Sequence, residues 1–184
     1  MKRNVKRHAV VQPQDQSTRL IPLTLGQNMT VDALDYDDLM RWNWQSRWEP
    51  TAQKFYVVRS RVDEEDGPGA RHIPVQRQIL TRINAPRIPR VDHINGDTLD
   101  NRRCNLRLST ASQNGGNRCK LNKNNRSGYH GVHLDKWTGR WRALIKVDRK
   151  KICLGRFDDR EGAARAYNAA AIKYFGEFAT LNKV

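Results

Sequence analysis

The sequence predicts an α+β protein assembled from small units, and two observations support this class. Short runs of β-prone residues separated by turn-forming residues occur twice, in 91–108 and in 128–157. A segment that begins near Arg160 carries apolar residues at spacings of three and four, the pattern of an amphipathic helix. The chain has 184 residues, enough for one ordinary domain or two small ones, and each could bury only a modest core.

The composition carries a large positive charge. Lys and Arg together number 34 against 19 Asp and Glu, which gives a formal net charge of +15 at pH 7. Residues 126–184 contribute +7, residues 91–125 contribute +3 and residues 1–19 contribute +4 of this excess. An excess of this size favours a polyanionic partner, with nucleic acid first and an acidic membrane surface second.

Two classes of protein are disfavoured. No stretch of the chain approaches the roughly 18 apolar residues that a membrane span needs, and no apolar signal-peptide core follows Met1. We therefore expect a soluble, cytoplasmic protein. The cysteines, Cys104, Cys119 and Cys153, are odd in number and include no Cys-x-x-Cys pair, so the sequence indicates neither a disulfide framework nor a thiolate zinc site.

The first 90 residues divide into a basic tail, 1–19, and a unit with several apolar clusters, 20–90. The tail could contact phosphates or remain a solvated arm, and both interpretations stay open. Within the unit we expect one short helix that begins after Asp32 and ends near Met40. Two prolines in residues 85–90 predict an extended connector to the next segment.

A β-prone run and three tryptophans mark the rest of this unit. Phe55–Val58 predicts a strand, and the acidic and glycine-rich run Asp63–Gly69 after it predicts a hairpin loop. Trp42, Trp44 and Trp48 could stack on nucleic-acid bases, but aromatic residues at such close spacing favour a role in the core.

Residues 91–118 predict a strand, a loop, a second strand and a helix. The two strands are Val91–Ile94 and Leu106–Leu108, and the loop between them is rich in Gly, Asp and Asn. A Ser-Thr pair after the second strand can cap a helix whose first turns run through Asn114.

Three side chains of this segment suit phosphodiester hydrolysis. Asp92 and His93 are adjacent, so on a regular strand they point to opposite sides unless the strand end twists. A helix packed across the hairpin would bring Asn114 close to both. A neutral His can take a proton from water, while a hard divalent cation neutralises the phosphoryl oxygens and helps the leaving oxygen. Asp92 and Asn114 supply oxygens suited to Mg²⁺ or Mn²⁺, a set too hard for thiolate-type zinc.

The same segment resembles the ββα-metal motif of HNH homing endonucleases, in the variant found in phage-borne group I intron enzymes. The matching string, D-H-I-N-G-D-x-x-D-N-R-x-x-N-L-R-L-S-T-x-S-Q-N, runs from Asp92 to Asn114. The resemblance implies that His93 is the general base and that Asp92 and Asn114 bind a single divalent cation, Mg²⁺ or Mn²⁺. It also implies that Asn105 orients His93 and ties the loop.

The segment departs from the family pattern at two places. Gly115 and Gly116 follow the last motif residue, and each glycine costs a helix about 1 kcal/mol, so we expect this helix to end early. Relatives often carry His-Arg just upstream of the motif, where this chain has Gln76-Arg77. Any accessory role of that histidine is therefore absent.

From Gly128 the pattern changes to three strands and one helix. We expect strands at Tyr129–Leu134, Trp141–Val147 and Lys150–Phe157, joined by tight turns, and a helix from about Arg160.

Alternation along the strands assigns the two faces of this sheet. The face toward the helix carries Trp141, Ala143, Ile145, Val147, Ile152 and Leu154. The other face carries Arg142, Leu144, Lys146, Lys151 and Cys153. A basic face of this kind is expected of a sheet that lies in a DNA major groove, and a solvated basic surface is the alternative.

This C-terminal segment resembles the ethylene-response-factor, or APETALA-type, DNA-binding domain. The strings Y-x-G-V, W-x-x-x-W, L-G-x-F, E-x-A-A-x-A-Y-x-x-A-A and F-G-x-x-A-x-L-N lie between Gly128 and Asn182. The resemblance implies a three-stranded antiparallel sheet packed on one helix, with double-stranded DNA as the partner. By position, the implied DNA contacts are His130, His133, Trp137, Arg140, Arg142, Lys146 and Lys151.

Four positions depart from the plant domains. His130 and His133 replace arginines, Leu144 replaces a glutamate, and Cys153 replaces a tryptophan. These changes remove bidentate base readers, so we expect binding to depend mainly on phosphates.

Together these features predict a site-specific, metal-dependent DNA endonuclease of the homing type. It would be a monomer on DNA that nicks one strand, leaves 5′-phosphate and 3′-hydroxyl ends, and acts in the cytoplasm of a phage-infected bacterium. Two alternatives stay open: a DNA-binding transcriptional regulator with an inactive nuclease motif, and an RNA-binding protein that uses the tail and the tryptophans. The expected segments are a basic tail (1–19), an accessory, DNA-contacting unit (20–90), a nuclease core (91–118), a basic linker (119–127) and a DNA-binding domain (128–182).

Overall fold

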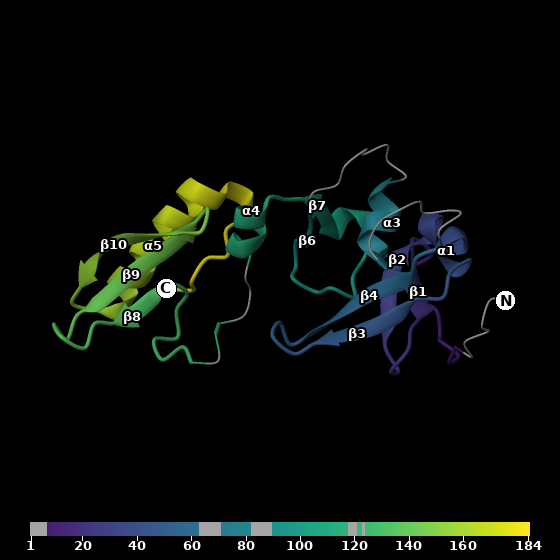
Figure 1. Ribbon diagram of the computed structural model, residues 1–184, viewed down its shortest axis with the longest axis horizontal. Helices are drawn as coiled ribbons and strands as arrows, with labels where there is room; N and C mark the ends of the chain where they lie inside the picture. Colours follow the sequence, from purple (N-terminus) through teal and green to yellow (C-terminus); the bar gives the residue numbers. More distant parts are fainter. Residues whose placement is uncertain (1–6, 63–70, 82–89, 118–120, 123) are drawn as a thin grey trace. The chain divides into compact units, whose positions relative to one another are not determined.

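The computed structural model forms two compact units, Met1–Leu108 and Ser109–Val184 (Figure 1). It describes residues 7–62, 71–81, 90–117, 121–122 and 124–184. The described residues form a mixed α/β structure with several small antiparallel sheets, as the sequence predicts. The expected hairpin loop at Asp63–Gly69 and nearly all of the expected connector at 85–90 lie outside the described residues.

The first unit begins with a two-stranded sheet that leads into a helix. Strand β1 (Thr18–Pro22) pairs with β2 (Asn28–Asp32), and helix α1 (Ala33–Met40) follows directly. Asp32 has an extended backbone at the N-cap, and Asp35 places a carboxylate in the first turn, where the helix dipole favours negative charge. The helix predicted after Asp32 is therefore confirmed in position and length.

A second antiparallel sheet of the first unit has its strands in chain order. Strand β3 (Gln45–Glu49) pairs with β4 (Lys54–Ser60), which pairs with β5 (His72–Pro74), and helix α3 (Val75–Thr81) follows. The strand expected at Phe55–Val58 is thus the centre of β4.

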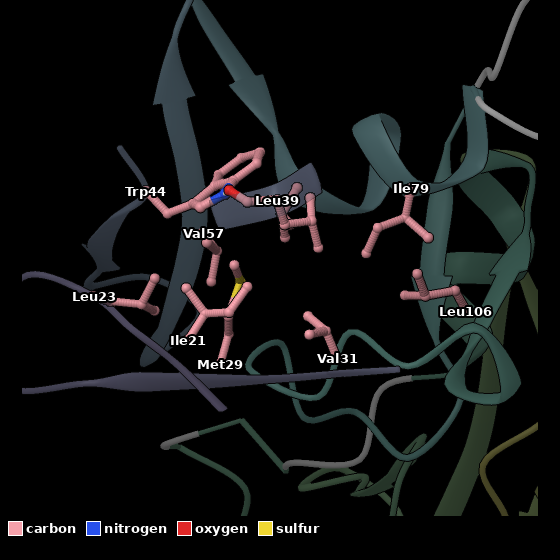
Figure 2. Close-up of a cluster of buried hydrophobic side chains, with 10 residues drawn as sticks. Ile21, Leu23, Met29, Val31, Leu39, Trp44, Val57, Ile79 and Leu106 are labelled. Carbon is pink, nitrogen blue, oxygen red and sulfur yellow. The ribbon is translucent and has the colours of Figure 1, made fainter. Parts of the chain in front are cut away.

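The first unit has one hydrophobic core, which Figure 2 shows. Strand β2 alternates as a half-buried strand should, because Met29 and Val31 are fully buried while their neighbours are less so. Leu106, from the later strand β7, belongs to the same core. The buried members are Ile21, Leu23, Met29, Val31, Leu39, Trp44, Val57, Val75, Ile79 and Leu106.

The three tryptophans of this unit differ in environment. Trp44 is buried, and its indole N–H donates to the Leu39 carbonyl at 2.8 Å. Trp42 packs against the core, with the Arg59 guanidinium 3.7 Å from its ring centroid. Trp48 is 46% exposed, and its ring centroid lies 4.9 Å from that of Phe55. The expected core role is therefore correct for Trp44 and Trp42 and wrong for Trp48.

The expected hairpin of the motif segment forms within the first unit. Strand β6 (Val91–His93) pairs with β7 (Leu106–Leu108), with Asp92 opposite Arg107 and His93 opposite Leu106. A short 3₁₀ helix, η1 (Arg103–Asn105), leads into β7. Because Leu106 joins the core described above, the hairpin is packed as part of the N-terminal unit.

The second unit contains helix α4 (Ala111–Gly116) and a three-stranded sheet in the order β10, β9, β8. The strands are β8 (Val132–Leu134), β9 (Trp141–Val147) and β10 (Lys150–Phe157). Helix α5 (Arg160–Phe175) follows, with Asp159 as its N-cap, and η2 (Gly176–Phe178) comes after it. The bounds of β9 and β10 and the start of α5 agree with the sequence prediction.

Alanines let α5 pack closely on one face of this sheet. Ala163 and Ala164 contact Ala143 of β9, and Ala171 and Phe175 pack with Ile145. The apolar face predicted from alternation is therefore the face that the helix covers. Among the described residues, no helix is both long and apolar enough to cross a membrane.

The first strand of this sheet is shorter than predicted. The strand expected at Tyr129–Leu134 ends as predicted but begins three residues later, at Val132, because Gly131 adopts φ +70° and turns the chain before it. At this turn the Gly131 carbonyl accepts from the Leu144 amide at 2.8 Å, and the Tyr167 ring lies against the glycine. A side chain at residue 131 would collide with the Tyr167 ring and with the Leu144 carbonyl oxygen.

We predict that Gly131→Ala lowers the free energy of unfolding of the second unit by about 3 kcal/mol, because the new methyl group meets Tyr167 and the Leu144 carbonyl and the residue has positive φ. Gly139→Ala is the matched control, since Gly139 has nearly the same φ, +68°, but open space around it. It should cost only about 1 kcal/mol. Urea unfolding followed by circular dichroism measures both, and equal losses would contradict the packing explanation.

Candidate active site and nucleic-acid interface

The loop 94–105 between β6 and β7 is held on the rest of the first unit by main-chain hydrogen bonds. The Thr30 amide donates to the Leu99 carbonyl at 2.9 Å, and the Asn101 amide donates to the Thr30 carbonyl at 2.8 Å. The Thr98 hydroxyl donates to the Phe55 carbonyl of β4. Strands that are distant in sequence therefore set the path of this loop.

Charged side chains add to this attachment. The Arg103 guanidinium forms two hydrogen bonds with Asp35 of α1, at 2.9 and 2.8 Å, and Asp35 is only 1% exposed. The Arg103 amide also donates to the Asp32 carboxylate at 2.7 Å. On the other side of the loop, the Lys54 ammonium donates to the Gly96 carbonyl at 2.6 Å. These ion pairs and charge-assisted bonds fix both ends of the loop.

His93 is buried at the end of β6 and faces Asn101. Its Nε2 lies 3.1 Å from Asn101 Oδ1, while Asn101 Nδ2 donates to the Thr98 carbonyl at 3.2 Å. Because the amide nitrogen is directed at Thr98, the amide oxygen must accept from His93. A neutral His93 therefore carries its proton on Nε2 and its lone pair on Nδ1. Burial lowers the pKa of His93 below its usual value, and the bond to Asn101 opposes this shift only in part.

Asp92 is buried beside Arg107, the residue directly opposite on β7. Arg107 donates from Nε and Nη2 to Asp92 Oδ2, at 3.0 and 2.9 Å. The two side chains are 6% and 13% exposed. A buried carboxylate of this kind needs a compensating positive charge, and Arg107 supplies one.

Asn105 ties the loop through both ends of its side-chain amide. Its Oδ1 accepts from the Asn95 amide at 2.9 Å, and its Nδ2 donates to the Asp100 carbonyl at 2.7 Å. Asp100 in turn binds the Arg102 guanidinium and the Asn95 side chain. These contacts close the loop onto itself next to His93. The role of Asn105 in orienting His93 stays a prediction.

Asn114 lies in the second unit, on helix α4, while Asp92, His93 and Asn105 lie in the first unit. Thr110 caps α4 in a capping box with Gln113, as the Ser-Thr pair predicts. The helix ends at Gly116, where a side chain would lie 2.6 Å from the Phe175 ring. The approach of Asn114 to Asp92 and His93 stays a prediction.

The donor set expected for a metal ion consists of one carboxylate, Asp92, and one amide oxygen, Asn114. Both are hard oxygen donors, and two protein ligands leave room for water and phosphate oxygens, which suits Mg²⁺ or Mn²⁺. No cluster of three or more His, Cys, Asp or Glu side chains that could hold a metal ion forms among the described residues. The expected ligands, Asp92 and Asn114, are only two residues and include an asparagine, so they would not form such a cluster.

Four of the seven expected DNA contacts lie on one face of the second unit's sheet. His133 is opposite Arg142, and Lys151 is opposite Lys146, so these side chains share the face that α5 does not cover. His133, Lys146 and Lys151 are exposed and Arg142 is partly so.

The other three expected contacts lie outside the strands. Trp137 is 99% exposed, in the turn between β8 and β9, and Arg140 of the same turn pairs with Asp158 at 2.9 Å. His130 precedes β8, and its main chain exchanges two hydrogen bonds with the Asn182 side chain. His130 is therefore held by the end of the chain rather than by the sheet.

Cys153 sits on the same sheet face, beside Arg142. Its Sγ accepts from Arg142 Nε at 3.4 Å, and this contact lowers the pKa of the Cys153 thiol. The residue that replaces the plant tryptophan therefore fixes the position of a neighbouring arginine.

Sequence reasoning missed three residues that the structure places at these sites: Asn101, Arg107 and Arg156. Arg107 could have been found from the predicted hairpin, because it falls opposite Asp92 when the two strands are paired. Arg156 could not have been found in this way, because strict alternation from Lys151 and Cys153 places it on the face toward the helix, and a β-bulge between Cys153 and Gly155 turns it to the other face. Asn101 is a matched position of the motif string, but the string assigns it no role, and its position depends on main-chain hydrogen bonds to the distant Thr30.

Comparison with known families agrees with the motif segment. Residues 78–115 match the family model described as HNH endonuclease. This match contains Asp92, His93, Asn105 and Asn114, and it supports nuclease activity. No solved structure significantly resembles the chain.

Comparison with individual proteins agrees with the C-terminal resemblance. An AP2-like ethylene-responsive transcription factor of Arabidopsis thaliana is 39% identical over 64 residues, which is 29% of this chain and 15% of that protein. A second one from the same plant is 41% identical over 66 residues, 30% of this chain and 22% of that protein. APETALA2-like protein 2 of Oryza sativa subsp. indica is 46% identical over 56 residues, 30% of this chain and 13% of that protein.

The chain therefore spans less than a quarter of the length of these relatives. The two resemblances seen in the sequence are confirmed: this chain combines a segment similar to the HNH endonuclease family with one similar to AP2-like ethylene-responsive transcription factors.

We predict that Arg107→Ala lowers the free energy of unfolding by about 3 kcal/mol, because it leaves the buried Asp92 carboxylate without its counter-ion. Arg41→Ala is the matched control. Arg41 pairs with Asp38 at 3.3 Å but is 68% exposed, and such a pair contributes about 0.5 kcal/mol or less. Denaturant unfolding of both variants measures the difference, and similar losses would contradict the importance of burial for the Asp92 pair.

Proposed function

We propose that this protein is a metal-dependent homing-type DNA endonuclease that nicks one strand of its target. The observation that carries the proposal is the buried pair of His93 and Asn101 inside the segment that matches the HNH endonuclease model. This pair gives a histidine that is neutral at neutral pH and has a defined tautomer, which a general base requires.

In the proposed reaction His93 removes a proton from water through Nδ1, since Nε2 is engaged as a donor to Asn101. The water oxygen forms a bond to the scissile phosphorus, and the bond to the 3′ oxygen breaks. The leaving 3′ oxygen takes a proton from solvent, so the products are a 5′-phosphate and a 3′-hydroxyl, and the proton held by His93 returns to solvent. Asn105 keeps the loop closed around the base.

Asp92 and Asn114 would hold a single divalent cation, Mg²⁺ or Mn²⁺. When bound, this cation neutralises charge on the phosphoryl oxygens and stabilises the leaving 3′ oxygen. Within the chain, Arg107 is the group that balances the Asp92 charge in the absence of a cation.

The sheet of the second unit is proposed to hold the enzyme on double-stranded DNA. Its uncovered face carries His133, Arg142, Lys146 and Lys151, and the turn beside it carries the exposed Trp137. Three strands spaced about 4.8 Å apart fit a major groove about 12 Å wide. One active site per chain makes a nick the expected product of a monomer.

We predict that the protein converts supercoiled plasmid to the nicked form in the presence of Mg²⁺ or Mn²⁺ and that excess EDTA stops the reaction. His93→Ala should abolish nicking while leaving the affinity for DNA unchanged, because the base does not hold the duplex. Gel electrophoresis measures the first result and fluorescence anisotropy the second.

A protein that binds DNA but does not nick it, or that nicks equally well as His93→Ala, would contradict the nuclease proposal. The first outcome would favour a DNA-binding regulator. Tighter binding to single-stranded RNA than to duplex DNA in competition would favour an RNA-binding protein instead.

We also predict that Asn101→Ala lowers the cleavage rate roughly 10- to 100-fold, because His93 loses the partner that sets its tautomer and ring orientation. Single-turnover cleavage with DNA saturated by enzyme measures the rate, and anisotropy should show unchanged DNA affinity. Circular dichroism checks that the variant is folded. A rate equal to that of the unaltered protein would contradict the role of Asn101.

A further inference from the structure

Arg156 of β10 extends the basic surface of the sheet beyond the contacts expected from sequence. It lies directly opposite Arg142 of β9, which in turn lies opposite His133 of β8. Directly opposed residues of an antiparallel pair share a face, so these three side chains form one row across the uncovered face.

This face carries two like-charge pairs, Arg142 with Arg156 and Lys146 with Lys151. Like charges placed directly opposite each other on neighbouring strands destabilise a sheet. A polyanion that binds across the face removes this repulsion. These like-charge pairs lower the stability of the free protein, and they favour the binding of a polyanion such as DNA.

Asp135, at the end of β8, holds the Arg156 guanidinium by one edge. Arg156 Nε donates to Asp135 Oδ2 at 2.9 Å, and Asp135 Oδ1 accepts from the Trp137 amide at 3.1 Å. Within the described part of the chain, the two Nη groups of Arg156 donate no hydrogen bond. The guanidinium is thus oriented by Asp135 while half of the side chain remains exposed.

We propose that Arg156 binds a backbone phosphate of double-stranded DNA and that Asp135 orients its guanidinium for this contact. The inference rests on the proposed DNA-binding function of the sheet. A phosphate is the expected partner because roughly half to two-thirds of protein–DNA hydrogen bonds go to phosphate and sugar oxygens, with arginine among the main donors. The two Nη groups suit the bidentate geometry of a phosphate.

The test measures the affinity of the full-length protein for a short duplex of mixed sequence at several salt concentrations, with EDTA present to prevent cleavage. Arg156→Ala should weaken binding several-fold and lower the slope of log affinity against log salt by about 0.9, the value for one lost phosphate contact. Lys151→Ala is the reference for a contact already expected. Arg165→Ala, an exposed arginine on α5, is the matched control and should leave both quantities unchanged.

Asp135→Asn separates orientation from simple electrostatics. If Asp135 only repelled DNA, removing its charge would tighten binding. Because it orients Arg156, the variant should bind more weakly. Arg156→Lys should retain most of the salt slope but not the full affinity, since a lysine cannot donate in the bidentate geometry. Thermal unfolding should show that the Arg156 variants are as stable as Arg165→Ala.

Two results overturn the inference while leaving the function of the sheet intact. One is an Arg156→Ala variant that binds like the unaltered protein while Lys151→Ala is weakened. The other is tighter binding by Asp135→Asn. If neither Lys151→Ala nor Arg156→Ala changes affinity or slope, the proposed DNA-binding role of the sheet fails, and the inference fails with it.

Discussion

The two main-chain hydrogen bonds between Thr30 and the loop 94–105 are the interaction on which the candidate active site depends. They place Asn101 at a fixed position, and Asn101 in turn orients His93. Asn101 is completely buried, so its amide must find partners inside the protein, and it finds them in His93 and the Thr98 carbonyl. The N-terminal sheet therefore acts as the support of the proposed base, and the hairpin that carries the base shares its hydrophobic core.

Burial has opposite consequences for the two adjacent residues of the motif. For His93 it disfavours the charged form and lowers the pKa, which keeps the imidazole neutral and able to accept a proton. For Asp92 it requires a counter-ion, and the strand pairing supplies Arg107 directly opposite. Adjacent positions on one short strand thus differ in environment: His93 lies opposite the apolar Leu106, and Asp92 lies opposite Arg107.

Regular periodicity made much of the second unit predictable from sequence. Strands β9 and β10 and the start of α5 follow from alternation and from the three-and-four spacing of alanines. The prediction failed at two places: β8 begins only after Gly131, whose positive φ turns the chain where Tyr167 lies against it, and Trp48 on β3 is exposed while the nearby Trp44 is buried. At the candidate active site, the motif string contains both His93 and Asn101, but their pairing depends on the position of Thr30, which no local pattern connects to the loop.

The two proposed functions use charge in physically different ways. On the second unit, exposed like charges such as Lys146 and Lys151 face each other across the sheet, where salt screens them and where a polyanion relieves their repulsion. In the first unit, the Arg107–Asp92 pair next to the proposed base is buried, so salt screens it little. The net charge of +15 therefore conceals a division: the charge proposed to attract DNA is exposed, whereas the Asp92 charge beside the proposed base is buried and paired with Arg107.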